Sequence, residues 1–123
     1  MQNILILDNS DNVLEVLEIV LKKTGEFKVY TCNCVNSLFD NLQSLIPDLL
    51  ILDVMHTQLT KEMICEDLRK RNALKNIPII ITSTQPAHIN NYQDFGANDG
   101  LEKPFDLKKM KSKLNTLLNT SLN

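Results

Sequence analysis

The stretch that decides the fold is Pro47-Asp48-Leu49-Leu50-Ile51-Leu52-Asp53, in which four aliphatic residues run unbroken between two aspartates. A short apolar run with turn formers before it and no polar alternation is typical of a strand buried on both faces, as at the centre of a parallel sheet. Asp53 stands at the carboxyl end of this strand. Because open α/β sheets bind ligands at that edge, Asp53 is the first candidate for a functional residue.

Four other segments have the composition of strands, and two of them also end in polar side chains. Their β-branched and apolar content predicts strands over residues 3–7, 28–32, 77–83 and about 101–102. The first of these is followed by Asp8, and the third ends in Thr82 and Ser83. A carboxylate or a hydroxyl is therefore expected at the end of three neighbouring strands.

Apolar residues recur at helical spacing between the strands. The first helix is expected to be capped by Asp11 or Asn12 and to end at Gly25, with a buried face of Val13, Val16, Leu17, Val20 and Leu21. Further helices are predicted over residues 35–45, about 60–71 and 86–95. The last helix, capped by Asp106, is expected to turn inward Leu107, Met110, Leu114, Leu117 and Leu118.

Alternation of strands and helices, with no hairpin signals, predicts an α/β fold of five βα units. Right-handed crossovers favour a five-stranded parallel sheet in the order 2-1-3-4-5, doubly wound by five helices in the flavodoxin-like manner. The first and third strands are then neighbours. Asp8 and Asp53 are therefore predicted to meet at the switch point between them.

Length and composition restrict the class of protein. The 123 residues, 43% of them hydrophobic and 23% charged, are expected to form a single domain over residues 1–123. The net charge of −2 gives no reason to expect a nucleic-acid or membrane partner, and no apolar run approaches the ~18 residues of a membrane span. We expect a cytoplasmic protein whose three cysteines, Cys32, Cys34 and Cys65, are reduced core or loop residues.

The predicted sheet edge has the chemistry of a phosphoryl-transfer site. Two carboxylates with no compensating charge in either loop favour a hard cation such as Mg²⁺. Asp53 is also a candidate nucleophile, and a carboxylate attacks phosphorus only where the phosphoryl charge is neutralised. Lys103 and Ser83 follow the fifth and fourth strands, so both are expected over the same rim.

The sequence resembles the receiver domain of two-component response regulators over essentially its whole length. The resemblance rests on five marks at family spacing, namely Asp8, Pro47-Asp48 leading to Asp53, Ile77-Pro78 leading to Thr82-Ser83, Gly96-Ala97, and Lys103-Pro104-Phe105. Singly each mark is weak, but five in order are specific.

The resemblance implies a role for each rim residue. Asp53 would accept a phosphoryl group from the phosphohistidine of a histidine kinase or phosphotransfer protein. Asp8 and the backbone carbonyl of Met55 would help Asp53 to hold Mg²⁺, Ser83 would bond a phosphoryl oxygen, and Lys103 would neutralise the acyl phosphate. The domain would then act on a downstream protein or an output domain, as a signalling switch and not as an enzyme.

The sequence departs from the family pattern at three places that bear on function. Asn9 stands where a second acidic residue is usual, which predicts weaker Mg²⁺ binding. The loop from Met55 to Lys61 lacks the usual proline and glycines, and its His56 is expected to be exposed. Gly100 replaces the aromatic residue that usually swings inward three positions before the lysine.

Two other functional classes are compatible with the fold. A degenerate receiver that docks proteins without being phosphorylated is suggested by Asn9, Gly100 and the altered loop. An enzyme, either flavin-binding or a phosphatase with an aspartyl nucleophile, is disfavoured because Asp8 and Asp11 would repel a flavin phosphate and lack the D-x-D spacing of the phosphatases. The last helix carries a basic stripe of Lys108, Lys109, Lys111 and Lys113. We interpret it as a solvated face, with docking of an acidic partner or a contribution to a dimer surface as alternatives.

Overall fold

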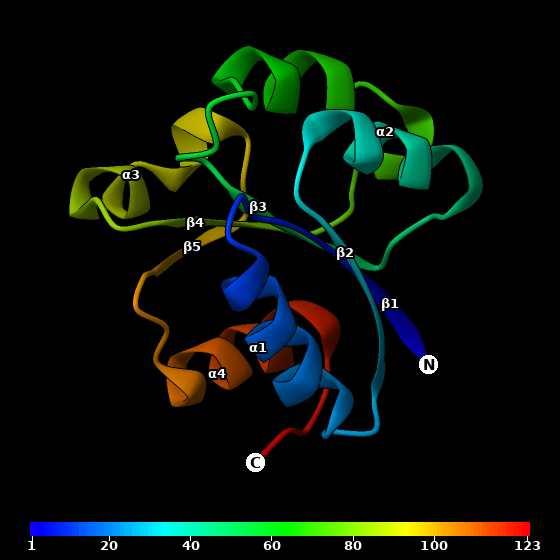
Figure 1. Ribbon diagram of the computed structural model, residues 1–123, viewed down its shortest axis with the longest axis vertical. Coiled ribbons are helices and arrows are strands. Elements are labelled where there is room, and N and C mark those ends of the chain that lie inside the picture. The colour runs from blue at the N-terminus through cyan, green and yellow to red at the C-terminus, as the bar shows by residue number, and fades with distance from the viewer.

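The computed structural model describes residues 1–123 as a five-stranded, all-parallel sheet with helices on both faces (Figure 1). The strand order is β2-β1-β3-β4-β5, which confirms the predicted topology. The strands are β1 (Gln2–Leu7), β2 (Phe27–Cys32), β3 (Leu49–Asp53), β4 (Ile79–Ser83) and β5 (Asp99–Glu102).

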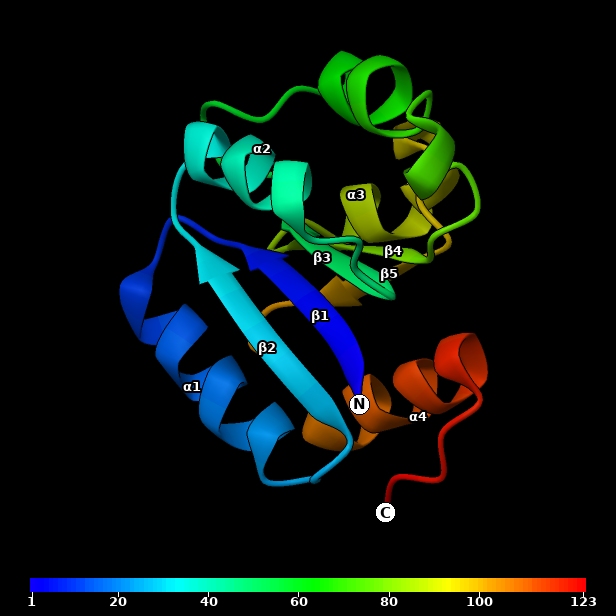
Figure 2. The ribbon, with the colours of Figure 1, turned by 90° about the vertical axis from the view of Figure 1, so that its right-hand side faces the viewer.

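Helical segments connect the strands and cover both faces of the sheet. They are α1 (Asp11–Lys22), α2 (Val35–Ser44), the π-helix η1 (Met63–Leu68), the 3₁₀ turn η2 (Asn72–Leu74), α3 (Pro86–Asn90), the 3₁₀ turn η3 (Tyr92–Phe95) and α4 (Leu107–Leu118). In Figures 1 and 2, α1 and α4 lie together on one face, and α2 lies on the other. None of the helices is long and apolar enough to cross a membrane.

Two of the predicted helices have a different form in the structure. The segment expected to be α-helical over residues 60–71 begins with one short stretch of α-helix and continues as the π-helix η1. The segment expected over residues 86–95 is interrupted at Asn91, where φ is −110° and ψ is 32°, so that α3 and η3 are separate. Because of this break, η3 runs in a different direction from α3 and places Phe95 in the core.

The core is divided by the sheet into two layers. Alternate residues of β1 point to opposite faces, so Ile4 and Ile6 pack with α1 and α4, whereas Leu5 and Leu7 pack with α2 and η1. Every residue of the central strand β3 is buried, as an unbroken aliphatic run predicts. Burial of each of these large side chains contributes roughly 1.5–3 kcal/mol, so Asp53 ends a strand that is firmly packed on both faces.

The first helix begins one residue earlier than the sequence predicts. Ser10, and not Asp11 or Asn12, is the N-cap, and its hydroxyl accepts a hydrogen bond from the Val13 amide at 3.3 Å. The buried face is correspondingly made of Leu14, Leu17 and Leu21. The prediction that Val16 is buried is wrong, since 56% of this residue is exposed, and Leu107 on α4 is likewise 45% exposed.

A single arginine, Arg69, links the short helical segments η1, η2 and η3, which lie on the same face of the sheet as α2. The Arg69 guanidinium donates hydrogen bonds to the carbonyl oxygens of Gly96 at 2.9 Å, Leu74 at 3.1 Å and Ile77, and to the Asn98 side chain at 2.6 Å. Burial lowers the pKa of this guanidinium. Because its donors are used on backbone oxygens, Arg69 fixes the ends of η1, η2 and η3 relative to β4 and β5.

Candidate functional site

The sheet register places two carboxylates side by side at the carboxyl edge. Leu7 pairs with Leu52 across the β1–β3 ladder, so the residues that follow, Asp8 and Asp53, lie at the same level of the rim. Each is only 1% exposed. The structure therefore brings together two buried acids at the strand pair where the winding of the sheet reverses.

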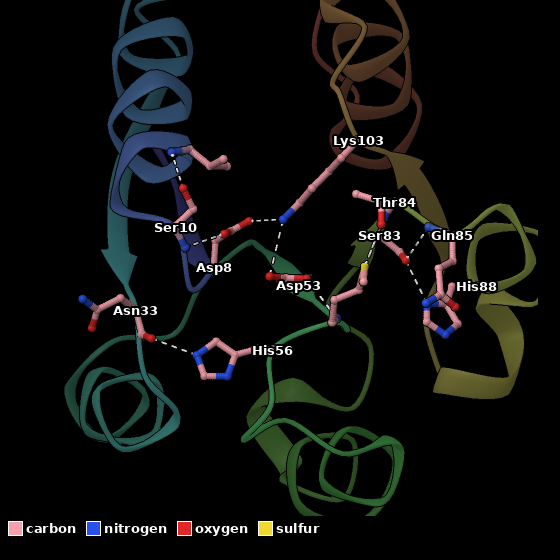
Figure 3. A network of polar contacts seen from close by, with 12 residues as sticks. Asp8, Ser10, Asn33, Asp53, His56, Ser83, Thr84, Gln85, His88 and Lys103 are labelled. Carbon is pink, nitrogen blue, oxygen red and sulfur yellow. Dashed lines mark hydrogen bonds and ion pairs between the residues drawn. The ribbon is translucent and has the colours of Figure 1, made fainter.

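Lys103 lies between these two acids. Its Nζ is 2.5 Å from Asp8 Oδ2 and 3.4 Å from Asp53 Oδ2, and Figure 3 shows the lysine reaching down over both. The backbone positions it, because β5 pairs with β4 and the Lys103 amide donates to the Ser83 carbonyl at 2.8 Å. With two carboxylates and one ammonium group the cluster keeps one net negative charge, which favours a further cation.

Backbone amides fix the remaining oxygen of each carboxylate. The Ser10 amide donates to Asp8 Oδ1 at 2.8 Å, and the Met55 amide donates to Asp53 Oδ1 at 2.9 Å. In both acids Oδ2 is therefore the oxygen that faces Lys103 and the centre of the rim. This arrangement leaves each Oδ2 available to a cation or an electrophile on the open side.

Ser83 is at the same rim but is directed away from Asp53. Its Oγ is 2.8 Å from His88 Nδ1 and accepts a hydrogen bond from the Gln85 amide at 3.0 Å. Figure 3 shows the Ser83 side chain pointing towards His88, on the opposite side from Asp53. Of the four side chains that the sequence places at the rim, the structure thus brings Asp8, Asp53 and Lys103 into contact and holds Ser83 apart by its rotamer.

Met55, expected to complete the metal shell, and Asn9, expected to weaken it, both lie close to the acids in sequence. Asn9 is exposed, in the bend between β1 and α1. The Met55 carbonyl oxygen accepts no hydrogen bond within the protein. The sulfur of the Met55 side chain lies 3.4 Å from the Thr84 amide nitrogen and 3.0 Å from the Thr84 hydroxyl. A free carbonyl oxygen directly beside Asp53 is a suitable ligand for a hard cation.

The expectation that His56 is exposed is wrong. This residue is 5% exposed, its Nε2 is 2.8 Å from the Asn33 carbonyl, and its Nδ1 accepts from the Gln58 amide at 3.1 Å. The pairing of Nδ1 with a donor and of Nε2 with an acceptor defines the neutral Nε2–H tautomer. Gln58 in turn accepts from the Val35 amide at 3.0 Å, so the loop is anchored to α2 without the usual proline and glycines.

Sequence reasoning also missed His88. A helix that begins at Pro86 places His88 in its first turn, and helical side chains there lean back towards the preceding strand end. The one indication in the sequence of a contact between Ser83 and His88 was that only five residue positions separate them, with a helix start between them. Only the structure shows that the two side chains bond to each other.

Comparison with protein families agrees with this arrangement. The model of the response regulator receiver domain matches residues 4–115. The chain belongs to this family. Receiver domains are signalling domains of two-component systems that interact with histidine kinases or phosphotransfer proteins and with output domains, and they bind Mg²⁺ at their acidic pocket.

Individual relatives show how far the likeness extends. The response regulator Rre1 of Synechocystis is 27% identical over 119 residues, which cover 94% of this receiver and 51% of Rre1. A receiver-modulated diguanylate cyclase from Pelobacter carbinolicus is 28% identical, with a TM-score of 0.79 and coverage of 97% and 93% of the two chains. The chemotaxis response regulator CheY4 of Vibrio cholerae, 21% identical with a TM-score of 0.84 and coverage of 95% and 98%, shares the fold. The receiver spans about half the length of the curated relatives it matches.

The residues of this receiver fit the divalent cation of the family. Asp8 and Asp53 offer two buried carboxylates, and the unbonded Met55 carbonyl offers a third oxygen. Mg²⁺ is commonly held by one or two carboxylates together with waters and substrate phosphate oxygens, and does not need a cage made only of protein. The neutral side chain of Asn9 is the departure, because it supplies no third charge.

Proposed function

We propose that this receiver accepts a phosphoryl group on Asp53 from the phosphohistidine of a histidine kinase or phosphotransfer protein, and so changes its affinity for a downstream protein or output domain. Residues 1–123 act in this proposal as one receiver unit, which is the substrate of the transfer and not an enzyme with a substrate of its own. The observation that carries the proposal is the position of Lys103 Nζ between the carboxylates of Asp8 and Asp53.

The transfer follows from the positions of these groups. An Asp53 carboxylate oxygen forms the new bond to phosphorus, the bond from phosphorus to the donor imidazole nitrogen breaks, and the electron pair leaves with that nitrogen. Asp53 Oδ1 is held by the Met55 amide, which leaves Oδ2 as the attacking oxygen. Lys103 stands 3.4 Å from that oxygen and neutralises the phosphoryl oxygens as they arrive.

Asp8, Asp53 and the Met55 carbonyl are the groups that would hold Mg²⁺. The ion would supply positive charge that offsets the negative charge of the aspartate and of the incoming phosphoryl group. Asn9 would contribute a neutral oxygen at most, so the affinity of this receiver for Mg²⁺ is expected to be lower than that of a receiver with a second acid there.

An apolar groove beside the rim suits the approach of the phosphodonor. The groove lies between α1 and the segment after β5, and Lys103 lines it together with Val13, Val16, Pro104 and Phe105. Val16 is 56% exposed, although it is apolar and lies on a helix with a well-packed opposite face. A helical partner that packs its apolar side chains in this groove would present its phosphohistidine to Asp53.

A second candidate function is docking without phosphorylation. It is favoured by the neutral, exposed Asn9 and by the hydrogen bond that holds Ser83 away from Asp53. A receiver of this kind would bind its partner in the unmodified state. It would give no covalent product with a phosphodonor.

The two functions are separated by phosphorylation of the purified chain. With Mg²⁺ and acetyl phosphate, we expect intact-mass spectrometry to show the addition of one phosphoryl group, with loss of the product when Asp53→Asn is used or Mg²⁺ is chelated. Asp11→Asn is the matched control, because Asp11 is an exposed carboxylate just beyond the rim and should leave the product unchanged. Absence of any adduct on the wild-type chain would overturn the proposal and leave docking as the function.

A further inference from the structure

The hydroxyl of Ser83 has a partner on the far side of the rim. Ser83 is fully buried, and its Oγ lies 2.8 Å from Nδ1 of His88. The other partner of Oγ is the Gln85 amide, which can only donate, so Nδ1 is the one acceptor within reach of the buried hydroxyl proton and Ser83 donates to His88. Nδ1 is then the acceptor, and the His88 ring is the neutral Nε2–H tautomer.

His88 connects this hydroxyl to the surface. Its ring meets the ring of Phe95 edge to face, with 5.6 Å between centroids and 81° between planes. Phe95 is itself covered by Lys61, whose Nζ is 4.9 Å from the ring centroid. A continuous chain of contacts thus runs from the end of β4 through α3 and η3 to the start of the helical segment that continues into η1.

This receiver has no side chain at the β5 position where the family usually carries an aromatic residue that swings inward. Position 100 is glycine, and a β-carbon there would lie 3.1–3.3 Å from the side chain and backbone of Ile89. α3 therefore packs directly on the β5 backbone, in the space that a larger side chain would need. A signal from Ser83 has to leave the rim by another path, and His88 is its hydrogen-bonded neighbour.

We propose that His88 is the positioning residue that couples the state of Asp53 to α3 and η3, an inference that rests on the phosphoacceptor function proposed above. In the unmodified receiver His88 holds the Ser83 hydroxyl away from Asp53. When Asp53 carries a phosphoryl group, Ser83 rotates about χ1 and donates to a phosphoryl oxygen. A neutral hydrogen bond is exchanged for a charge-assisted one, which is the stronger of the two.

This exchange has a consequence for the surface around α3. Once Ser83 has turned away, His88 Nδ1 loses its donor, and the contact of the ring with Phe95 is no longer fixed from the rim. α3 has only five residues and none of them is buried, so apart from the packing of Ile89 on the β5 backbone it is held mainly at its His88 end. The surface of α3 and η3 is accordingly the face that the modification changes for a partner.

The spectroscopic test uses the wild-type chain labelled with ¹⁵N in its two histidines. Beryllofluoride with Mg²⁺ serves as the phosphoryl mimic on Asp53. We expect the His88 Nδ1 shift to move when the mimic binds, because the hydrogen bond from Ser83 is lost. His56 is the internal reference, since its nitrogens bond to Asn33 and Gln58 and should keep their tautomer.

A double-mutant cycle tests the coupling by rate. His88→Phe keeps a ring against Phe95 but removes the acceptor, and should speed acetyl phosphate labelling of Asp53 by roughly three- to tenfold, the value of one neutral hydrogen bond. In a Ser83→Ala background the same substitution should have no further effect. Asn90→Ala, on the exposed side of α3, is the matched control and should leave the rate unchanged.

The outcomes separate this inference from the function on which it rests. If the wild-type chain binds neither acetyl phosphate nor beryllofluoride, the phosphoacceptor function fails and the role of His88 fails with it. If Asp53 is modified but the His88 Nδ1 shift stays constant, or His88→Phe acts equally with and without Ser83, the phosphoacceptor function stands and the role of His88 is overturned.

Discussion

Gly100 lies directly against Ile89, so closely that a β-carbon at position 100 would be 3.1 Å from Ile89 Cγ2 and 3.2 Å from its Cα. Contacts this short force a neighbour to move, and here one of the neighbours is backbone. The glycine that interrupts the family pattern therefore lets α3 pack tightly on β5, and a side chain there would require Ile89 to shift by a few tenths of an ångström.

Substitution of this glycine is expected to destabilise the fold. We predict that Gly100→Ala lowers the free energy of unfolding by about 1–3 kcal/mol, the usual cost of overpacking. Adding Ile89→Ala, which removes the Cγ2 contact, should return part of that loss. Urea unfolding of the three chains measures both effects. A Gly100→Ala variant as stable as the wild type would show that α3 is free to move away.

A carboxylate at position 9 is expected to strengthen metal binding. Asn9→Asp adds a third negative charge next to Asp8, and we predict that it raises the Mg²⁺ affinity by roughly tenfold, since ligand charge sets the affinity of oxygen sites. Isothermal titration calorimetry measures the change. Asn76→Asp makes the same charge change in an exposed turn before β4, at the opposite edge of the sheet, and should have little effect. Equal gains in the two variants would mean that net charge and not ligation is responsible.

The face that α1 turns towards the core is tested by substitutions of two residues on different sides of one helical turn. Leu14 is 6% exposed and Val16 is 56% exposed. Leu14→Ala is therefore expected to cost about 2–5 kcal/mol of unfolding free energy, and Val16→Ala only about 0.5 kcal/mol. Denaturant unfolding of both variants measures the two losses of unfolding free energy. Equal losses, or a larger loss for Val16→Ala, would contradict the orientation of α1 seen in the structure.

Stability at alkaline pH is expected to depend on Cys32. Burial, with a smaller effect of Cys34, raises the pKa of the Cys32 thiol from 9.0 to about 12. The folded chain thus holds this proton more tightly than the unfolded chain does, so the contribution is fully present below pH 9.0 and is lost as the pH rises towards about 12. We predict a loss of about 1 kcal/mol between pH 9 and pH 10 from this group.

The variant Cys32→Ala isolates this effect from the other groups that titrate in the same range. Its unfolding free energy should fall less between pH 9 and pH 10 than that of the wild type, whereas Cys65→Ala should behave as the wild type does. Urea unfolding at the two pH values provides the comparison. A slope that is the same in all three chains would exclude Cys32 as its source.

The sheet was predictable from the sequence because strand composition and strand ends are local properties. An unbroken aliphatic run such as 49–52 needs burial on both faces, and alternation with helices leaves few topologies, so the order of the strands is confirmed. The meeting of Asp8, Asp53 and Lys103 also depends on the sheet alone. Asp53 is the last residue of β3, Asp8 and Lys103 directly follow β1 and β5, and parallel strands end at one edge.

Features that depend on loop conformation or on a single rotamer were not predictable in this way. Val13, Leu14, Val16 and Leu17 are all apolar, so the face of α1 is decided by where the helix begins, and the cap at Ser10 shifts it by one residue. The burial of His56 depends on the path of two loops towards each other. The direction of Ser83 depends on His88, which reaches it only because α3 starts at Pro86.

The measurement that tests the phosphoacceptor role most directly locates the modified residue. After treatment with acetyl phosphate and Mg²⁺, borohydride reduces an aspartyl acyl phosphate to homoserine, and tandem mass spectrometry of the peptides reads its position. The account predicts homoserine at position 53 and at no other aspartate. Homoserine at Asp8 or elsewhere, or no homoserine on a chain that binds Mg²⁺, would contradict it.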